Sequence, residues 1–337
     1  MTRPTMPLAR VKDLLNAGRR ARILVIGDVM LDQFIWGSVD RISPEAPVPV
    51  IDFQRESFMP GGAANVARNL SALGVPAELF SIVGQDEPAQ RLRQLLRGQG
   101  VAASGLLAQS ERPTSIKTRI VAHRQQVVRI DRESRRELDA QTASRLLKAL
   151  GTRLDSAAGL IVGDYGKGVV TQGLLDTLKR LCRERGLWLS LDPKPVHQLN
   201  LSGLSLITPN RKEAFELSGL PDETREANPL ADLNLIRTAG RLLNDLAPAL
   251  LLITLGEQGM LLCRRGEKPH HIPTVAKEVF DVSGAGDTVI ATFTLAIAAG
   301  GSPLEAAIFS NHAAGAVVAK VGTATVTPQE LVASFRR

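Results

Sequence analysis

One stretch of the chain combines the residue types that phosphoryl transfer requires, namely residues 281–288 with the sequence DVSGAGDT, and an apolar run follows it. Glycines let a backbone turn tightly, and the first turn of a helix leaves several N–H groups unpaired. We therefore expect Gly284, Ala285 and Gly286 to hold the charge on a transferring phosphoryl group. Asp287 would be the general base that takes the proton of an attacking hydroxyl. The alternative is that Asp287 only caps a buried helix.

Two acidic residues follow the first predicted strand. Residues 22–27 (RILVIG) form a continuous apolar run, which is typical of a strand buried on both faces, and they lead to Asp28 and Asp32. Ligands of open α/β sheets bind beyond the carboxyl ends of the strands. We therefore expect Asp28 and Asp32 to bind sugar hydroxyls, although Asp is also common in turns.

A double glycine opens a helix further along, where the sequence PGGAAN precedes VARNLSALG. Gly61 and Gly62 allow a ligand to approach the backbone closely, and Asn65 would reach a hydroxyl from the first turns of the helix. The alternative is an ordinary loop in which Asn65 serves as a cap.

Polar segments follow the later strands too, in residues 164–168, 192–194, 209–213 and 254–259. Lys167 or Lys194 would neutralise phosphate oxygens. Asn210 and Glu213, three apart at a helix start, would hold a hydrated Mg²⁺ beside the phosphates. The alternative for Glu213 is a favourable interaction with the positive end of its own helix. Glycines around residue 255 leave room for a flat adenine.

Strands and helices alternate over most of the chain, which predicts an α/β fold with a mainly parallel sheet covered by helices on both faces. The predicted strands are residues 22–27, 78–83, 159–163, 187–191, 204–208, 250–255 and 259–263. The predicted helices are residues 88–97, 140–154, 173–185, 212–217, 232–246, 285–299 and 303–320. We expect residues 1–20 to be an extension with a short helix at 8–15, and residues 21–337 to be a single domain.

A small separate sheet is expected beside the main one. Residues 115–131 alternate apolar and polar side chains as a half-exposed hairpin does, and residues 48–53 form a short strand-like segment after Pro44 and Pro47. Together they would form a lid, from segments at about 34–58 and 112–131. Its basic residues are Lys117, Arg119, Arg124 and Arg129; such residues are usually a solvated face.

The composition is that of an ordinary soluble globular protein, with 44% hydrophobic and 22% charged residues. The net charge of +7 comes from scattered Lys and Arg, so anionic small molecules explain it at least as well as nucleic acid. Only two cysteines are present, far apart, which predicts a reducing cytoplasm. No signal peptide is evident, and the apolar run at 289–299 is too short to span a membrane.

The segments GGAAN (61–65) and DVSGAGDT (281–288) resemble the two signatures of the ribokinase/PfkB carbohydrate kinase family, and TPNRKE and TLGEQGM match as well. The resemblance covers residues 21–330. It implies a ribokinase-like fold with a β-lid that commonly forms a homodimer interface, ATP and Mg²⁺ as cofactors, and Asp287 as the base. It places sugar hydroxyls at Asp28, Gly61, Gly62 and Asn65. The expected ATP contacts are Asn210, Arg211, Lys212, Glu213, Lys194, Thr254, Gly256, Gly259 and Asn311, with Glu213 holding the metal through water.

Within this family, GDVMLDQFIWG, RISPEAPVPV, DYGKG and GAGDTVI resemble the kinases that phosphorylate D-glycero-D-manno-heptose 7-phosphate at the anomeric hydroxyl, on the route to ADP-heptose for lipopolysaccharide. Many of these are one half of a bifunctional protein. None of the five His forms the His-x-Gly-His arrangement expected of the second half, so we expect a stand-alone kinase. The substrate's own phosphate would be anchored by Lys117, Arg124, Lys167 or Lys194. The alternatives are another sugar or sugar phosphate, and a catalytically silent nucleotide-binding protein.

Overall fold

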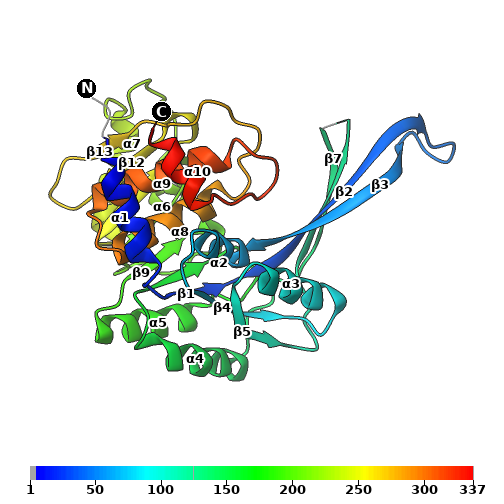
Figure 1. Cartoon of the computed structure of the whole chain (residues 1–337), viewed down its shortest axis with the longest axis horizontal. Coiled ribbons are helices and arrows are strands. Elements are labelled where there is room, and N and C mark those ends of the chain that lie inside the picture. Colours follow the sequence, from blue (N-terminus) through cyan, green and yellow to red (C-terminus); the bar gives the residue numbers. More distant parts are fainter. Residues whose placement is uncertain (1–4, 124, 337) are drawn as a thin grey trace.

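The computed structural model describes residues 5–123 and 125–336, and within them the strands form two sheets (Figure 1). The larger sheet has nine strands in the order β13-β12-β11-β10-β9-β8-β1-β4-β5 in this described part of the chain. All neighbours from β11 to β5 are parallel, and β12 and β13 are antiparallel. The strands are β1 (Ile23–Gly27), β4 (Ala77–Val83), β5 (Ala102–Ala108), β8 (Gly159–Gly163), β9 (Leu189–Asp192), β10 (Leu206–Ile207), β11 (Leu250–Thr254), β12 (Met260–Cys263) and β13 (His270–Ile272).

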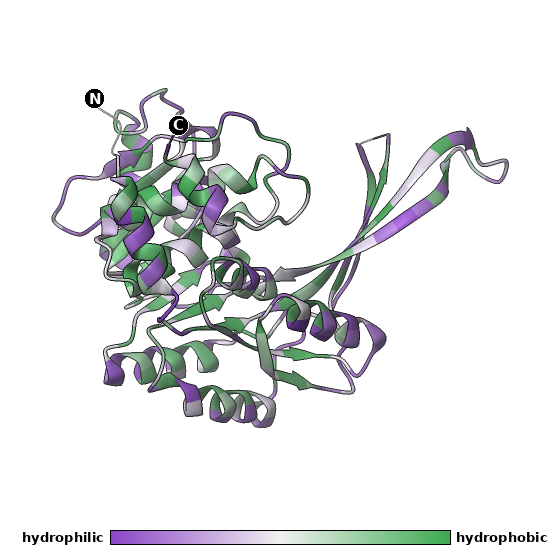
Figure 2. Ribbon diagram, viewed as in Figure 1, coloured by the Kyte–Doolittle hydropathy of each residue, from purple (hydrophilic) through white to green (hydrophobic). Residues whose placement is uncertain are grey.

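Helices cover both faces of this sheet, so its strands are apolar on both sides, as Figure 2 shows. In β1, Ile23 and Val25 pack into one core, whereas Leu24 and Ile26 pack into the other. The first core includes α1 (Leu8–Gly18), α2 (Ala63–Ala72), α3 (Glu87–Gly98), α8 (Ala285–Ala298), α9 (Pro303–Val317) and α10 (Pro328–Ser334). The second includes α4 (Ala140–Leu154), α5 (Gln172–Arg185), α6 (Arg211–Ser218) and α7 (Leu233–Asp245). The predicted α/β class is confirmed.

The second sheet projects from the body in Figure 1 and has the strand order β3-β2-β6-β7. Its strands are β2 (Val29–Ile42), β3 (Pro49–Gly62), β6 (Ile116–Ala122) and β7 (Gln125–Arg132). The hairpin predicted at 115–131 is therefore present. However, β2 was not expected, and β3 extends well beyond residues 48–53. The prolines at 44 and 47 lie in the connection between these strands rather than within a strand, so they do not break the pairing.

The N-terminal segment differs from the expected extension. Helix α1 buries Val11 and Leu14 completely, because its apolar side chains face the core that includes α8 and α10. On its outer side, Arg10 donates to the Glu305 carboxylate at 2.7 Å. Strands β5 and β13 and helix α10 were not predicted either. No helix within residues 5–123 and 125–336 is long and apolar enough to cross a membrane.

Candidate active site

Asp287 lies in the first turn of α8, and its carboxylate points into the protein. The helix begins at Gly284, whose φ of 79° is a left-handed conformation that suits glycine. Asp287 is 8% exposed; Tyr165 donates its hydroxyl to Oδ1, and Asn65 Nδ2 donates to Oδ2 at 2.6 Å. Gly284, not Asp287, is the N-cap residue, and that cap involves no side-chain hydrogen bond. The capping alternative therefore does not describe this carboxylate.

The surroundings of Asp287 shift its acidity towards neutral pH. The pKa of Asp287 is raised to about 6. Burial is the main cause and the negative charge of Asp32 adds to it, while hydrogen bonds from Tyr165 and Asn65 and the charge of Arg68 oppose the rise. A carboxylate with such a pKa is mostly ionised at pH 7 yet basic enough to share a proton with a hydroxyl. Its properties are those of a general base.

The backbone N–H groups beside Asp287 are accessible, since Gly286 is exposed and Gly284 and Ala285 are half-buried. The Ala285 N–H donates to the Val282 carbonyl at 3.2 Å, so in this conformation it is already engaged. Within the described residues we find no acceptor for the N–H groups of Gly284 and Gly286. The predicted anion site therefore has two open donors rather than three.

A chain of buried polar side chains lies behind Asp287, and its members beyond Asn65 were not predicted from the sequence. Asn69 Nδ2 donates to the Asn65 carbonyl at 2.9 Å, and Thr288 Oγ1 donates to Asn69 Oδ1 at 2.9 Å. These contacts join the first turns of α2 and α8. The signal in the sequence is the pair Asn65 and Asn69, four apart on an otherwise apolar helix, which places two amides on one face.

Asp28 holds the segment that follows β8. Its Oδ2 accepts from the backbone N–H groups of Tyr165 at 2.9 Å and Lys167 at 3.0 Å, and its Oδ1 accepts from the N–H of Val169 at 2.9 Å. Three donors occupy most of what a carboxylate can accept. The structure therefore gives Asp28 a role in positioning Tyr165, and its predicted contact with sugar hydroxyls stays a prediction.

Asp32, on β2, is 3% exposed and is paired with Arg119 of β6. The backbone of Gly61 lies directly against the Asp32 carboxylate, so a Cβ at position 61 would clash with Oδ2. Gly62 has a φ of 62°, and a Cβ there would lie 2.5 Å from the carbonyl oxygen of Asp28. The double glycine thus brings β3 against both acidic residues, which is why two glycines are required.

Two of the predicted phosphate anchors meet at one acidic residue. Lys167 Nζ lies 2.5 Å from Glu133 Oε2, and Lys117 Nζ lies 3.1 Å from Asp131 Oδ2 and 3.8 Å from Glu133 Oε2. Lys167 is 8% exposed, because it lies beneath the base of the projecting sheet. Of the other two predicted anchors, Arg124 lies outside the described residues and Lys194 lies beside Glu213. Lys167 and Lys117 therefore carry carboxylate partners that an anionic ligand would have to share.

The predicted nucleotide residues divide into two groups. Asn210 and Glu213 form a capping box at the start of α6, in which each side chain accepts a hydrogen bond of 3.0 Å from the other residue's backbone N–H. Glu213 therefore interacts with the N-terminus of its own helix, as the alternative interpretation expected. Lys194 Nζ is 3.3 Å from the other carboxylate oxygen of Glu213. Asp192 lies close by: burial, together with the charges of Glu213 and Asp287, holds its pKa well above the ordinary range.

The remaining predicted contacts lie elsewhere around the strand ends. Arg211 directs its guanidinium to Asp222 at 2.6 Å and Asp232 at 2.9 Å, and Lys212 has a side chain that is 85% exposed. These two residues are not brought to the Asp192–Glu213 group. Thr254 pairs with Asn210 as an isolated bridge, Gly256 and Gly259 both have positive φ, and Asn311 Nδ2 donates to the Pro273 carbonyl at 2.8 Å.

No group of three or more His, Cys, Asp or Glu side chains in the described part of the chain forms a ready metal cage. Mg²⁺ usually keeps several waters and binds through one or two carboxylates together with substrate phosphates. Glu213 and Asp192 are the carboxylates of this group that would hold such a hydrated ion, with Lys194 as the present partner of Glu213.

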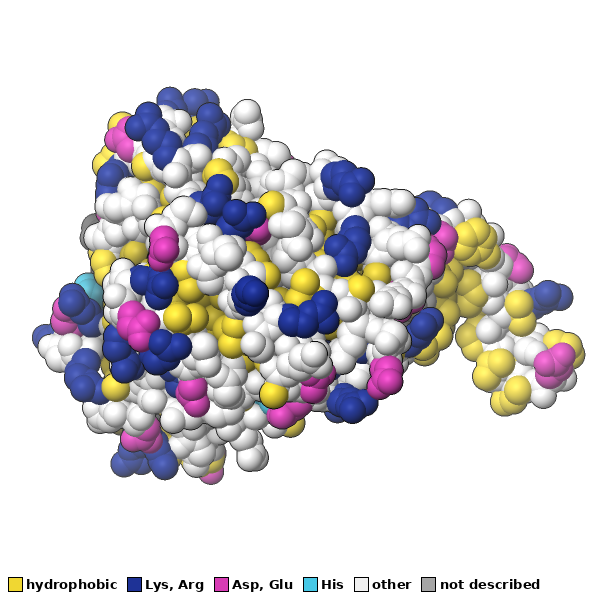
Figure 3. All heavy atoms as spheres, turned by 90° about the horizontal axis from the view of Figure 1, so that it is seen from below, with side chains coloured by type: hydrophobic (Ala, Val, Ile, Leu, Met, Phe, Trp, Pro, Cys, Tyr) yellow, Lys and Arg dark blue, Asp and Glu magenta, His cyan; other side chains and the backbone are white. Residues whose placement is uncertain are grey.

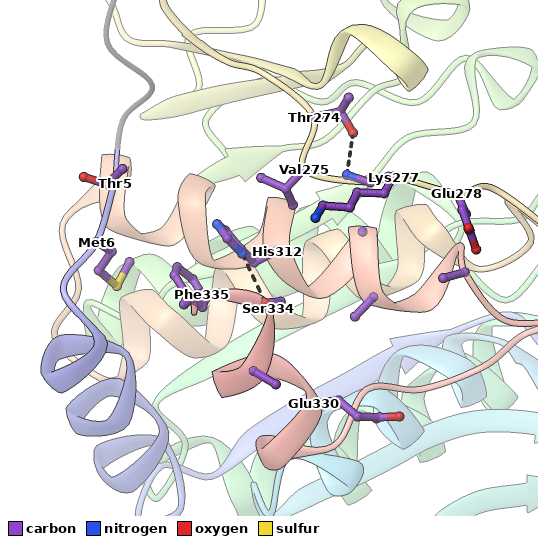
Figure 4. A pocket seen from close by; sticks show the side chains of 15 residues that line it. Thr5, Met6, Thr274, Val275, Lys277, Glu278, His312, Glu330, Ser334 and Phe335 are labelled. Carbon is purple, nitrogen blue, oxygen red and sulfur yellow. Dashed lines mark hydrogen bonds between the residues drawn. The ribbon is translucent and has the colours of Figure 1, made fainter. Parts of the chain in front are cut away.

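A cavity of about 810 Å³ lies apart from these groups, between α9, α10 and residues 274–278 (Figure 4). His312 stacks on Phe335 there, with ring centroids 3.6 Å apart. Burial lowers the pKa of His312 to about 4, so the ring is neutral. None of the residues predicted for the site lines this cavity.

A parallel sheet whose strand ends hold a buried carboxylate at a glycine-led helix start is the arrangement of a phosphotransferase. Residues 20–330 match the pfkB family of carbohydrate kinases, and the chain belongs to this family. Its members are ATP-dependent sugar kinases. The resemblance seen in the two signature segments is therefore confirmed.

Several relatives match over nearly the whole chain. "Bifunctional protein HldE" of Pelobacter propionicus is 43% identical over 96% of this chain and 64% of its own length. The protein of the same name from Caulobacter sp. strain K31 is 45% identical over 93% of this chain and 62% of its own length. The chain thus spans less than two thirds of the length of these relatives.

Solved structures show the same fold at low sequence identity. Arabidopsis thaliana ribokinase in complex with ribose and ATP superposes with a TM-score of 0.74 at 19% identity, covering 94% of this chain and 99% of the other. Phosphofructokinase-2 from Escherichia coli in complex with substrates and products gives a TM-score of 0.75 at 21% identity, covering 94% and 98%. The predicted ribokinase-like fold is confirmed.

Proposed function

We propose that this chain transfers the γ-phosphoryl group of ATP to the anomeric hydroxyl of D-glycero-D-manno-heptose 7-phosphate, giving ADP and the 1,7-bisphosphate on the route to ADP-heptose. The observation that carries the chemistry is Asp287, a buried carboxylate with a pKa of about 6 beside open N–H groups at the start of α8. The choice of the heptose rests on the resembling segments and on the HldE relatives. We place the reaction in the cytoplasm, where ATP is available.

In the proposed reaction the sugar hydroxyl gives its proton to Asp287 as its oxygen bonds to the γ-phosphorus, and the bond from that phosphorus to the ADP oxygen breaks. The N–H groups of Gly284 and Gly286 stabilise the charge on the transferring group. We assign the nucleotide phosphates to the neighbourhood of Lys194, Asp192 and Glu213; the Lys194 ammonium lies 3.3 Å from Glu213 and can contact an anion. A bound Mg²⁺ would neutralise phosphate charge there.

We assign the substrate's own phosphate to Lys167 and Lys117. Both ammonium groups converge on Glu133, and a phosphate would replace or share this partner. K167M is expected to raise the KM for a sugar phosphate more than tenfold while leaving the KM for ATP unchanged. K148M is the matched control, because Lys148 is exposed on α4 and belongs to no predicted site. An equal rise of both KM values in K167M would contradict the assignment.

We propose that the projecting sheet pairs with a second copy of the chain, as the β-lid of the family suggests. The sheet carries exposed apolar side chains, and apolar surface also shows on this projection in Figure 3. These exposed residues are Ile42, Val48, Phe53, Val127, Val128 and Ile130. Sedimentation should give a dimer for the wild type and a monomer for F53E/I130E; a wild-type monomer at micromolar concentration would refute this.

The test of the proposed function is ADP release with ATP and Mg²⁺ over a panel of acceptors: the heptose 7-phosphate, fructose 6-phosphate, fructose, ribose and adenosine. A strong preference for the heptose phosphate supports the proposal. Turnover with another sugar alone would keep the kinase chemistry and reject the substrate. No turnover with any acceptor would reject the catalytic assignment.

A further inference from the structure

Both oxygens of the proposed base are already occupied by donors. Tyr165 O–H is bonded to Oδ1 of Asp287, and Asn65 Nδ2 is bonded to Oδ2. A general base must be within hydrogen-bond reach of the proton that it removes. An incoming sugar hydroxyl therefore has to take the place of one donor or crowd beside it.

The two donors are held very differently. Asn65 is within α2, and Asn69 contacts both its backbone carbonyl and its side-chain oxygen, at 2.9 and 3.4 Å. The backbone of Gly284 closes over its amide, since a Cβ there would lie 2.7 Å from Nδ2. Asn65 is consequently fixed by its surroundings.

Tyr165 lies outside any helix or strand. Its backbone is held by a hydrogen bond from its N–H to the Asp28 carboxylate. Its ring packs against the backbone of two glycines: Cβ atoms at Gly163 and Gly62 would lie 3.0 and 3.4 Å from ring carbons. The next residue, Gly166, has a φ of 65° and nothing within 4 Å of the Cβ position. Of the two donors, Tyr165 is the one whose side chain has, within the described residues, no hydrogen bond besides that to Asp287.

We propose that Tyr165 is a positioning residue that occupies the acceptor site of the sugar hydroxyl on Asp287 until the sugar displaces it. While it is in place, the tyrosine hydroxyl occupies one of the acceptor positions of Oδ1 and hinders the approach of a water to that oxygen. This idea rests on the proposed function and adds to it a way to suppress wasteful ATP hydrolysis. In that side reaction a water oxygen would bond to the γ-phosphorus, its proton would pass to Asp287, and the bond to ADP would break to leave ADP and phosphate.

The electrostatics agree with this arrangement. Burial and the charges of Asp287 and Asp192 hold the pKa of Tyr165 well above its ordinary value, so the hydroxyl remains a donor at working pH. Its hydrogen bond lowers the pKa of Asp287. Removing the hydroxyl in Y165F therefore both frees Oδ1 and makes Asp287 harder to ionise.

The kinetic test compares Y165F with the wild type. We expect ATP hydrolysis without sugar to rise about tenfold, the equivalent of one hydrogen bond, and to vanish in Y165F/D287N. With sugar present, the acid limb of kcat/KM should move to higher pH. W188F is the matched control: it removes an aromatic donor that contacts Ser190 at 2.8 Å, and neither readout should change. The contrary result is that Y165F lowers the kinase rate and the hydrolysis rate equally and leaves the pH profile of kcat/KM unchanged. That result would show that Tyr165 has only a structural role, and the proposal would be wrong.

A direct test uses the fact that the chain has a single tyrosine. Fluorotyrosine labelling then gives one ¹⁹F resonance, which reports on Tyr165 alone. Saturation with the sugar phosphate in the absence of ATP should shift this resonance. A resonance that stays in place while calorimetry shows the sugar phosphate bound overturns the proposal. The hydrolysis assay needs no sugar, so failure of the proposed substrate and failure of the tyrosine proposal are distinguished.

Discussion

Asn65 and Asp287 are 222 positions apart in the sequence, yet the Asn65 amide donates to the Asp287 carboxylate at 2.6 Å. The contact joins the first turn of α2 to the first turn of α8. Each helix is preceded by a glycine in a left-handed conformation, with φ of 62° at Gly62 and 79° at Gly284. Two helices that each begin after a glycine thus meet at the carboxylate of Asp287.

Replacing the base should remove turnover and little else. D287N keeps the size of the side chain but cannot take a proton, so kcat should fall by about 10²–10⁴-fold. ATP binding, measured by titration calorimetry, and the midpoint of thermal unfolding should stay close to wild type. A variant that retained near wild-type turnover would show that Asp287 is not the base.

The pH dependence follows from the raised pKa of Asp287. Its ordinary value is 3.8 and burial raises it to about 6, so the base is protonated below pH 6 and ionised above. We expect kcat/KM to increase between pH 5 and 7 with a midpoint near 6. Asp164 also has a pKa raised to about 6 by burial, but it contacts His197 at 3.0 Å rather than Asp287. D164N should therefore retain the acid limb, and a profile that is flat over this range would contradict the assignment.

Gly284 tests the geometry of the helix start. In G284A the new Cβ would lie 2.7 Å from the Asn65 amide nitrogen, and the alanine would have to adopt the positive φ of Gly284. Strain of roughly 1–3 kcal/mol is expected, together with a displaced Asn65 and a large loss of kcat. G300A is the control, because Gly300 has a φ of 80° but nothing within 4 Å of its Cβ position. The two variants should lose similar stability in urea unfolding, and only G284A should lose activity.

The ion pair between Arg10 and Glu305 tests whether α1 belongs to the folded body. The hydrogen bond from Arg10 holds the pKa of Glu305 down at about 2, against an ordinary 4.5. The stabilisation is therefore complete above pH 4.5 and is lost as the pH falls towards 2. E305Q should unfold more easily than the wild type at pH 6, and the difference should shrink at pH 3. A difference independent of pH would exclude this ion pair as its cause.

The sequence predicted the elements whose signals are local. The glycines before Asp287 and the strand–helix alternation depend on neighbouring residues, and both appear where expected. Tyr165 and Asn69 were missed because their roles depend on partners more than a hundred positions away, at Asp287 and Thr288. The three backbone N–H groups that the fold brings to Asp28 could not be predicted for a related reason, and its contact with sugar hydroxyls stays a prediction.

Strand β2 was not predicted, because only residues 48–53, near the prolines, showed a strand-like pattern. In the structure those at 44 and 47 lie in the connection between β2 and β3, where a missing N–H does no harm. Helix α1 was underestimated because its apolar face is short, although Val11 and Leu14 are fully buried. In both cases the tertiary contacts, not the local pattern, decide the outcome.

Strand β3 ends at Gly62 and helix α2 begins at Ala63, so no loop separates the projecting sheet from the helix that carries Asn65. The projecting sheet is therefore joined directly to the helix whose Asn65 contacts Asp287, the proposed base. A tilt of the sheet has to be absorbed at Gly61 and Gly62 or passed to the amide that orients Asp287. Contacts made at the far end of the sheet are therefore connected to the position of Asn65 through Gly61 and Gly62.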